Sequence, residues 1–319
     1  MEASKLSYSF RAYPSLILPT ANQSFPKLSF SRFLVPFKAP QVFFRSTPSP
    51  YSTSFCRKIN SVMAGKQVAQ EKGKLLVFDS EEGLSVSLAE YTAQLSEKFT
   101  RERGAFTVVL SGGSLIESLR KLVESPYLES IEWSKWHVFW VDERVVPKDH
   151  EDSNYKLAYD GFLSKVPILP GHVYAINDAL SAEGAADDYE TCLKQLVKTS
   201  VIDSSATGWP KFDLMLLGMG PDGHVASLFP GHPLIHEKER WVTFIKDSPK
   251  PPPERITFTF PVINASANIA LVITGEGKAA PVSKALGSDQ TSISLPIQMV
   301  STEDGETTWF TDKAAASKL

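Results

Sequence analysis

Cysteine is scarce in this chain of 319 residues. Its two cysteines, Cys56 and Cys192, lie far apart and form no C-x-x-C pair, so the sequence predicts neither a disulfide framework nor a thiolate metal site. Long apolar runs are missing as well, because no stretch approaches the roughly 18 residues that cross a bilayer. These absences exclude a disulfide-rich scaffold and predict a protein without a membrane partner.

Acidic residues are almost absent from the first part of the chain. Residues 1–66 contain nine Lys or Arg and the single acid Glu2, together with twelve Ser and seven Pro. A segment rich in Ser, Pro and Arg and poor in acid is typical of a disordered transit peptide, and this one favours the plastid over the mitochondrion. A tail without a targeting role is the alternative, although disorder alone does not remove Asp and Glu.

The chain ends in Ser317-Lys318-Leu319, the tripeptide that directs proteins to peroxisomes. Together the two ends predict recognition by plastid and peroxisome import receptors. Met63 is a candidate internal start that would omit the transit segment.

Residues 67–319 hold the remaining 24 basic and 35 acidic residues. Such an acidic balance argues against a nucleic-acid partner, which needs clustered positive charge. The segment has no internal repeat and no long linker, so we expect one domain. Strand-like and helix-like stretches alternate along it, which is typical of an α/β protein with a mostly parallel sheet covered by helices.

We expect ligands to bind beyond the carboxyl ends of the strands, as in other open parallel sheets. The expected strands cover 74–79, 105–111, 137–142, 172–177, 212–217, 241–247, 255–260 and 268–274. The expected helices cover 81–103, 114–124, 153–163, 182–199 and 277–286.

The stretch LSGGS places Ser111, Gly112, Gly113 and Ser114 at a turn between a strand and a helix. Glycines let the backbone turn tightly and expose its N–H groups, which makes this turn a candidate site for an anion such as phosphate. The alternative is a capping box that needs no ligand, with Ser114 as the N-cap and Glu117 three residues later.

The stretch WVDERVVP ends another expected strand with Asp142, Glu143 and Arg144. Arg144 is a candidate phosphate ligand because its guanidinium forms charge-assisted hydrogen bonds, and a structural ion pair is the alternative. Downstream, Asn154 is a candidate polar contact, whereas the two residues before it resemble a helix N-cap.

Gly218, Gly220 and Gly223 have the spacing G-x-G-x-x-G directly after an expected strand. A dinucleotide site with this spacing needs a long helix after the third glycine. Pro230 and Pro233 leave room for only one or two helical turns, so the nucleotide interpretation is weak.

The same turn places His224 two residues after Asp222. A histidine at a strand end titrates near neutral pH and can serve as a general base, and a surface-loop histidine is the alternative. Asp142 or Asp222 would orient it. His232 and His236 suggest a metal, but no third ligand with recognisable spacing is near, so we expect none.

Six motifs in this order, LSGGS, VDERVVP, DSNY, DLMLLGMGPDGHVASLFPGHP, ERITFTFPVIN and GEGKAAPV, resemble the 6-phosphogluconolactonase family over roughly 67–312. The resemblance implies a doubly wound α/β fold with helices on both faces, shared with the glucosamine-6-phosphate deaminases. It implies hydrolysis of 6-phosphoglucono-δ-lactone in the pentose phosphate pathway, without a metal or cofactor.

The resemblance also assigns roles to residues. His224 matches the proposed base, and Arg144 and the Gly112–Ser114 turn match substrate-binding positions. Arg255 and Lys278 match basic positions that meet the phosphate. For Lys278, which begins a helix after a strand, a solvated lysine is the alternative.

The expected chemistry needs an activated water, a stabilised oxyanion and a proton for the departing ring oxygen, and one histidine can take and return that proton. The loop N–H groups near Gly220–Gly223 are candidates for the oxyanion. The main competing activity is glucosamine-6-phosphate deamination, whose motif carries a glutamate where this chain has Phe229 before Pro230. A sugar-phosphate-sensing module is the non-enzymatic alternative, but residues 1–66 lack the pattern of a DNA-binding helix pair.

Overall fold

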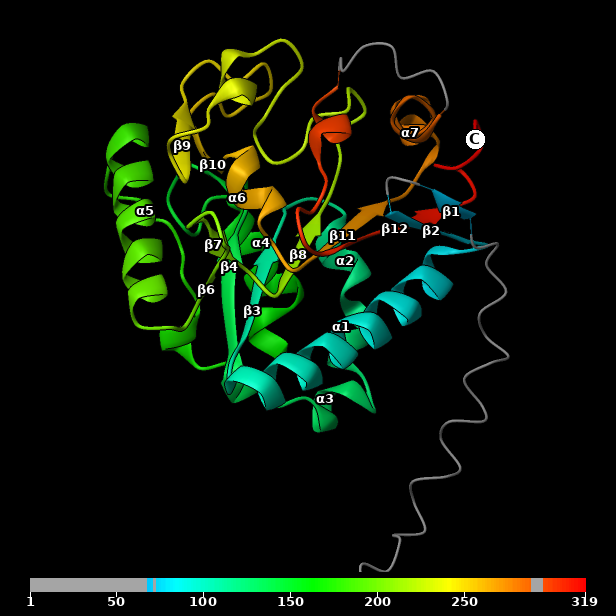
Figure 1. Ribbon diagram of the computed structural model, residues 1–319, viewed down its shortest axis with the longest axis horizontal. Helices are drawn as coiled ribbons and strands as arrows, with labels where there is room; N and C mark the ends of the chain where they lie inside the picture. Colours follow the sequence, from blue (N-terminus) through cyan, green and yellow to red (C-terminus); the bar gives the residue numbers. More distant parts are fainter. Residues whose placement is uncertain (1–67, 71–72, 288–294) are drawn as a thin grey trace, which may run out of the picture. The chain divides into compact units, whose positions relative to one another are not determined.

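A seven-stranded sheet forms the centre of the fold (Figure 1). The structure, a computed structural model, describes residues 68–70, 73–287 and 295–319. The strand order is β1-β2-β12-β11-β8-β3-β4, and all neighbours are parallel except β1 and β2. The strands are β1 Val68–Gln70, β2 Gly73–Phe78, β3 Phe106–Leu110, β4 Trp136–Trp140, β8 Leu214–Leu217, β11 Asn268–Ile273 and β12 Glu306–Asp312.

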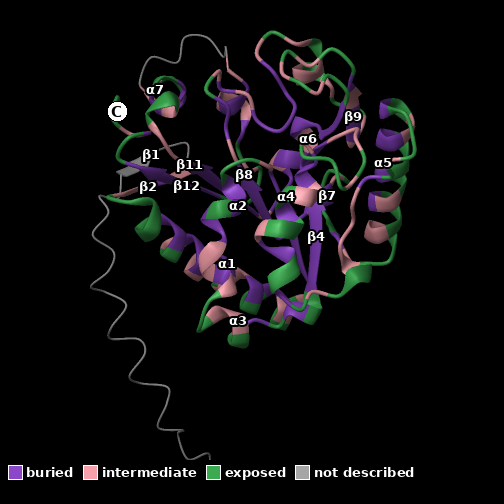
Figure 2. Cartoon of the chain, turned by 180° about the vertical axis from the view of Figure 1, so that it is seen from behind, coloured by how far each residue is buried: buried purple, intermediate pink, exposed green. Residues whose placement is uncertain are grey.

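Alternate residues of the central strands enter two separate cores, because successive side chains of a strand point to opposite faces. In β8, Met215 and Leu217 pack into one core and Leu214 and Leu216 into the other. Figure 2 shows these strands buried between helices that are exposed on their outer sides. This arrangement confirms the doubly wound, mostly parallel α/β fold.

Helices cover both faces of the sheet. On one face lie α1 Glu81–Arg103, α2 Leu115–Ser118, α3 Tyr127–Ser130 and α4 Asn154–Gly161, and on the other α5 Ala182–Lys198, α6 Phe260–Asn264 and α7 Ala279–Leu286. Short 3-10 turns are η2 Arg120–Val123, η3 Trp133–Lys135, η4 Leu163–Lys165, η5 Pro170–His172, η6 Pro233–His236, η7 Glu276–Lys278 and η8 Pro296–Met299. No helix of the described ranges is both long and apolar enough to cross a membrane.

Helix α1 has the bounds expected from the sequence. Ser80 accepts a hydrogen bond from the backbone of Gly83, and Gly104 ends the helix in the left-handed conformation. The expected helix at 114–124 is interrupted, because it consists of the four-residue α2 followed by the 3-10 turn η2.

A second, antiparallel sheet corrects part of the expected strand series. It contains β5 Asp142–Arg144, β10 Arg255–Phe258 and β9 Val242–Ile245, and a two-stranded ribbon pairs β6 Asp203–Ser204 with β7 Pro210–Lys211. The segments 241–247 and 255–260 were expected in the parallel sheet. Their apolar pattern indicates burial but does not specify a partner strand.

One expected strand is absent, and one strand of the sheet was not expected. The segment 172–177 is not a strand: it makes one isolated bridge, between Val138 and Val173, and begins in the 3-10 turn η5. Conversely, β12 lies near the middle of the sheet, yet its sequence ETTWFTD was not recognised as a strand. Its apolar content is low, and its burial comes from β2 and β11 on either side.

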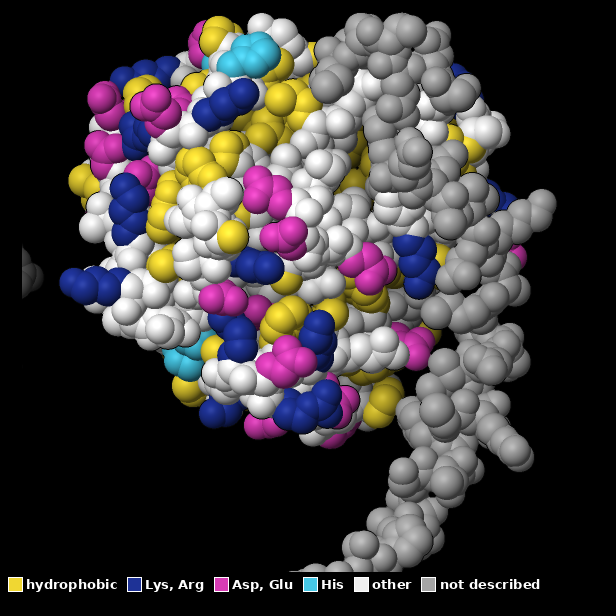
Figure 3. All heavy atoms as spheres, viewed as in Figure 1, with side chains coloured by type: hydrophobic (Ala, Val, Ile, Leu, Met, Phe, Trp, Pro, Cys, Tyr) yellow, Lys and Arg dark blue, Asp and Glu magenta, His cyan; other side chains and the backbone are white. Residues whose placement is uncertain are grey.

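One face of the molecule is mixed in charge (Figure 3). On the face seen in Figure 3, acidic and basic side chains of the described residues are interspersed rather than collected into a basic patch. The expected transit peptide at 1–66 and the candidate start Met63 lie outside the described residues.

Candidate active site

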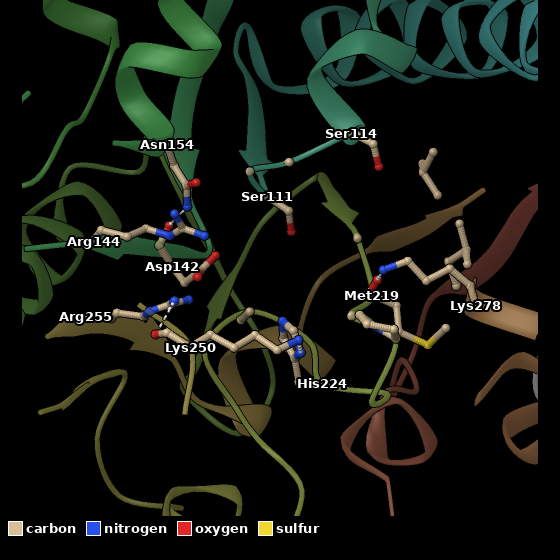
Figure 4. A pocket seen from close by; sticks show the side chains of 18 of the residues that line it. Ser111, Ser114, Asp142, Arg144, Asn154, Met219, His224, Lys250, Arg255 and Lys278 are labelled. Atoms are coloured by element: carbon tan, nitrogen blue, oxygen red, sulfur yellow. Dashed lines mark hydrogen bonds between the residues drawn. The ribbon is translucent and has the colours of Figure 1, made fainter. Parts of the chain in front are cut away.

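A pocket of about 300 Å³ lies at the carboxyl ends of β3, β8 and β11 (Figure 4). This is the edge at which open parallel sheets bind ligands. The pocket brings together nearly all the expected site residues, namely Ser111, Gly112, Gly113, Ser114, Asp142, Arg144, Asn154, His224, Arg255 and Lys278. Asp222 contacts the pocket residue His224 directly.

His224 and Asp222 form a hydrogen-bonded pair, with 2.5 Å between the imidazole Nδ1 and Oδ1 of the carboxylate. The His224 side chain is only 16% exposed and packs against the ring of Phe229, so it is not a surface-loop histidine. Burial lowers the pKa of His224, and the Asp222 carboxylate partly opposes this effect. Burial of Asp222 favours its neutral form, but the hydrogen bonds from His224 and Lys250 prevail and lower its pKa to about 2.

The backbone of Gly220 lies directly against the imidazole of His224. A Cβ on Gly220 would lie 2.0 Å from both Cε1 and Nδ1 of His224, so any larger residue would displace the imidazole. The N–H of Gly220 donates to the carbonyl of His224, and the N–H of Gly223 donates to that of Gly220. These two donors, expected as candidates for the oxyanion, are therefore used inside the loop.

Asp142 makes no hydrogen bond to the imidazole of His224. Its carboxylate accepts a 2.8 Å hydrogen bond from the Ser227 hydroxyl, and its backbone carbonyl accepts one from the amide of Asn154. Between the two possible orienting groups, the hydrogen bond is made by Asp222. Asn154 also packs on the glycine turn, since a Cβ on Gly112 would lie 1.9 Å from its Oδ1.

Glu143 fastens the end of β5 to the start of α4. Its buried carboxylate accepts hydrogen bonds from the backbone N–H groups of Arg144, Asn154 and Tyr155. Burial nevertheless raises the pKa of Glu143 to about 7. Ser153 is the N-cap of α4, as expected from the sequence.

Arg144 and Lys278 lie at the pocket wall, and neither forms an ion pair with a carboxylate of the described residues. Arg144 donates to the carbonyl of Asp152, while its buried Nε has no acceptor there. The structural ion pair considered as an alternative is therefore not formed. Lys278 donates to the carbonyl of Met219 at 2.6 Å, and burial lowers its pKa, so it is not a solvated lysine.

Arg255 is already occupied by protein acceptors. Its guanidinium donates to the carbonyls of Lys250, Pro251 and Pro252, and at 3.4 Å to the hydroxyl of Ser227. It lines the pocket, but its role toward a phosphate stays a prediction.

The glycine turn offers free donors. Within the described ranges, the N–H groups of Gly112, Gly113 and Ser114 have no acceptor, and the buried hydroxyl of Ser111 has no partner. Ser114 precedes α2 without a side-chain cap, so the capping-box alternative is wrong.

Lys250 was not recognised from the sequence. Its ammonium group lies 3.1 Å from Oδ1 of Asp222 and 3.3 Å from Nδ1 of His224. The only signal in the sequence is its place in the motif SPKPPPERIT, just before Arg255.

Comparison with known proteins shows which family the chain belongs to. Residues 79–309 match the family model described as Glucosamine-6-phosphate isomerases/6-phosphogluconolactonase. A probable chloroplastic 6-phosphogluconolactonase 4 of Oryza sativa is 74% identical over 248 residues, covering 77% of this chain and 76% of the relative. The chloroplastic 6-phosphogluconolactonase 3 of Arabidopsis thaliana is 66% identical over 264 residues, covering 82% and 80%.

A solved structure supports the same conclusion. The 6-phosphogluconolactonase of Thermotoga maritima superposes with a TM-score of 0.62 at 31% identity, covering 75% of this chain and 99% of that one. The family expected from the six motifs is confirmed. This chain belongs to the glucosamine-6-phosphate isomerase/6-phosphogluconolactonase family.

Proposed function

We propose that this chain hydrolyses 6-phosphoglucono-1,5-lactone to 6-phosphogluconate, the second step of the oxidative pentose phosphate pathway. The observation that carries the proposal is the His224–Asp222 pair at a pocket that also holds Arg144 and Lys278, two cations without a carboxylate partner in the described part of the chain. A phosphorylated lactone requires a base for reaction at its carbonyl carbon and cations for its phosphate. The relatives named above carry the same activity in their names.

His224 acts as the general base in this mechanism. Its Nδ1–H donates to Asp222, which leaves the lone pair of Nε2 to take a proton from water. The resulting hydroxide adds to the lactone carbonyl carbon. When the tetrahedral intermediate collapses, the bond from that carbon to the ring oxygen breaks, and Nε2–H returns its proton to the ring oxygen.

The remaining pocket residues bind charge. Arg144 and Lys278 hold the phosphate, and Arg255 contributes positive potential beside them. The free N–H groups of Gly112, Gly113 and Ser114 serve either the phosphate or the oxyanion. Asp142 accepts hydrogen bonds from Asn154 and Ser227 and so holds this part of the pocket wall in place.

The deaminase reaction is less well supported. Phe229 stands where the deaminase motif has a glutamate, and its ring is buried against His224.

The test of the proposed activity uses the purified chain. Opening of 6-phosphogluconolactone should exceed the spontaneous rate, and ammonia should not be released from glucosamine 6-phosphate. Ammonia release with no acceleration of lactone opening would reverse the assignment.

Targeting is a separate part of the proposal. Residues 1–66 act as a transit peptide for the plastid, and residues 67–319 form the catalytic domain. A product that starts at Met63 would lack the transit peptide, and Ser317-Lys318-Leu319 directs it to the peroxisome. The chloroplastic relatives support the plastid part. The three C-terminal residues are exposed, as a receptor requires, although Ser283 holds the carbonyl of Lys318.

Two fusions test the targeting. A fluorescent protein placed after Leu319 leaves the N-terminus free and should enter plastids. One that replaces residues 1–66 leaves the tripeptide free and should enter peroxisomes. Cytosolic fluorescence from both fusions would contradict the proposal.

A further inference from the structure

We propose that Lys250 is a positioning residue of the lactonase site, which holds the Asp222–His224 pair in one arrangement and keeps the imidazole unprotonated. This inference rests on the proposed function, because it concerns the base of that reaction. In Figure 4, the side chain of Lys250 extends toward His224.

The three groups meet at one oxygen. Oδ1 of Asp222 lies 2.5 Å from Nδ1 of His224 and 3.1 Å from Nζ of Lys250, and the two nitrogens are 3.3 Å apart. A carboxylate only accepts and an ammonium only donates. If Nδ1 accepted from Lys250, its lone pair would face the carboxylate oxygen at 2.5 Å, which is repulsive. The proton therefore lies on Nδ1, and Nε2 is left free.

The backbone of Lys250 is anchored independently of its side chain. Its carbonyl accepts hydrogen bonds from Nη2 of Arg255 at 2.9 Å and from the Ser248 hydroxyl at 2.8 Å. Arg255 is 2% exposed and also holds the carbonyls of Pro251 and Pro252. This clamp fixes the turn that carries Lys250, and it gives the buried Arg255 a function apart from the phosphate.

Charges of both signs act on the imidazole. Asp222 lies in the same loop, Asp142 belongs to β5, and Lys250 comes from the turn before β10. The two carboxylates raise the pKa of His224, whereas burial and Lys250 lower it. Removing the ammonium leaves the opposing carboxylates in place, so the pKa of His224 must rise.

The test compares three variants of the full chain: Lys250→Met, Lys250→Arg and the control Lys246→Met. The side chain of Lys246 is 53% exposed, and Lys246 precedes Lys250 by four residues. Lys246→Met therefore removes the same charge as Lys250→Met, but at a site that does not contact the imidazole. Nuclear magnetic resonance titration follows the imidazole of His224, identified by the signal missing in His224→Asn. The pH dependence of kcat/KM is measured in parallel.

We expect Lys250→Met to shift the His224 titration and the acidic limb of kcat/KM upward by about 0.5–1 pH unit. Lys250→Arg retains the charge and should stay near wild type, as should Lys246→Met. A raised KM with an unmoved titration would show that Lys250 is a substrate ligand instead, and would overturn the proposal.

The two proposals fail in different ways. Full activity of His224→Asn would remove the base from the mechanism, whereas the titration of His224 reports on Lys250 without any turnover. Circular dichroism checks that each variant is folded. If Lys250→Met does not fold, Lys250→Gln provides the neutral side chain, and an unshifted titration in it would equally reject the role.

Discussion

Nδ1 of His224 lies 2.5 Å from Oδ1 of Asp222, a residue two positions earlier in the same loop. This contact depends on the bare backbone of Gly220, against which the imidazole lies. The loop that follows β8 therefore supplies the histidine, the carboxylate that orients it and, at Gly220, the space for the imidazole.

Replacing His224 by Asn tests the base directly. The rate of catalysed lactone opening should fall by about 10²–10⁴-fold with the fold retained. In the wild type, kcat/KM should fall with decreasing pH as the imidazole takes up a proton, at a midpoint below the ordinary value of 6.5 because burial lowers the pKa of His224. Residual activity of His224→Asn should lack this acidic limb, and near wild-type turnover would exclude His224.

Asp222→Asn removes the carboxylate and keeps its shape. We expect a loss of roughly 10- to 100-fold in kcat, because Nδ1 loses its charged acceptor and an amide, which donates as well as accepts, no longer fixes the tautomer. The carboxylate raises the pKa of His224, so the acidic limb of kcat/KM should move to lower pH, opposite to Lys250→Met. Asp222→Glu is the control that retains the charge. An unmoved limb would show that the pair is not coupled.

Arg144→Ala tests the phosphate site. Because Arg144 has no carboxylate partner among the described residues, its loss should leave the fold intact. Loss of a charged hydrogen bond costs about 1.5–3 kcal/mol in substrate capture, which corresponds to about 10- to 150-fold in kcat/KM. Steady-state kinetics should show this mainly as a higher KM. Unchanged kcat/KM would exclude substrate contact by Arg144.

Gly220→Ala tests the space beside the imidazole. The added methyl group would lie 2.0 Å from two ring atoms of His224, so the ring must move away from Asp222. We expect activity to fall by about 10²-fold, with a folded protein by circular dichroism. Gly171→Ala is the matched control, since nothing lies within 4 Å of its Cβ position. Wild-type activity of Gly220→Ala would contradict the structure of this loop.

His137 links stability to pH at the opposite end of β4. Burial, together with the neighbouring His172 and Arg103, lowers the pKa of His137 from 6.5 to about 4. Between these values the unfolded chain binds a proton that the folded chain does not, so the free energy of unfolding should decrease as the pH falls from about 6.5 to 4. Urea unfolding of His137→Gln should show a flatter dependence of the free energy of unfolding on pH, and a wild-type slope in this variant would contradict the link.

Local patterns in the sequence determined much of this protein. The bounds of α1 follow from the capping residues Ser80 and Gly104, and the strand–helix alternation follows from apolar spacing. The carboxyl ends of parallel strands share one edge, so the motifs at 111–114, 142–144 and 218–224 could be expected at one site before the strand order was known. Each inference uses interactions within a few residues of the chain.

Other features were decided by tertiary structure alone. Strand β12 is polar in pattern and is buried only because β2 and β11 flank it. Strands β9 and β10 belong to a separate antiparallel sheet and not to the parallel one. Lys250 meets Asp222, 28 positions away, only because Arg255 clamps the intervening turn. Whether Asp142 or Asp222 orients His224 likewise depended on Ser227, which occupies the Asp142 carboxylate. Contacts between distant residues are set by strand pairing and loop packing, which no local pattern encodes.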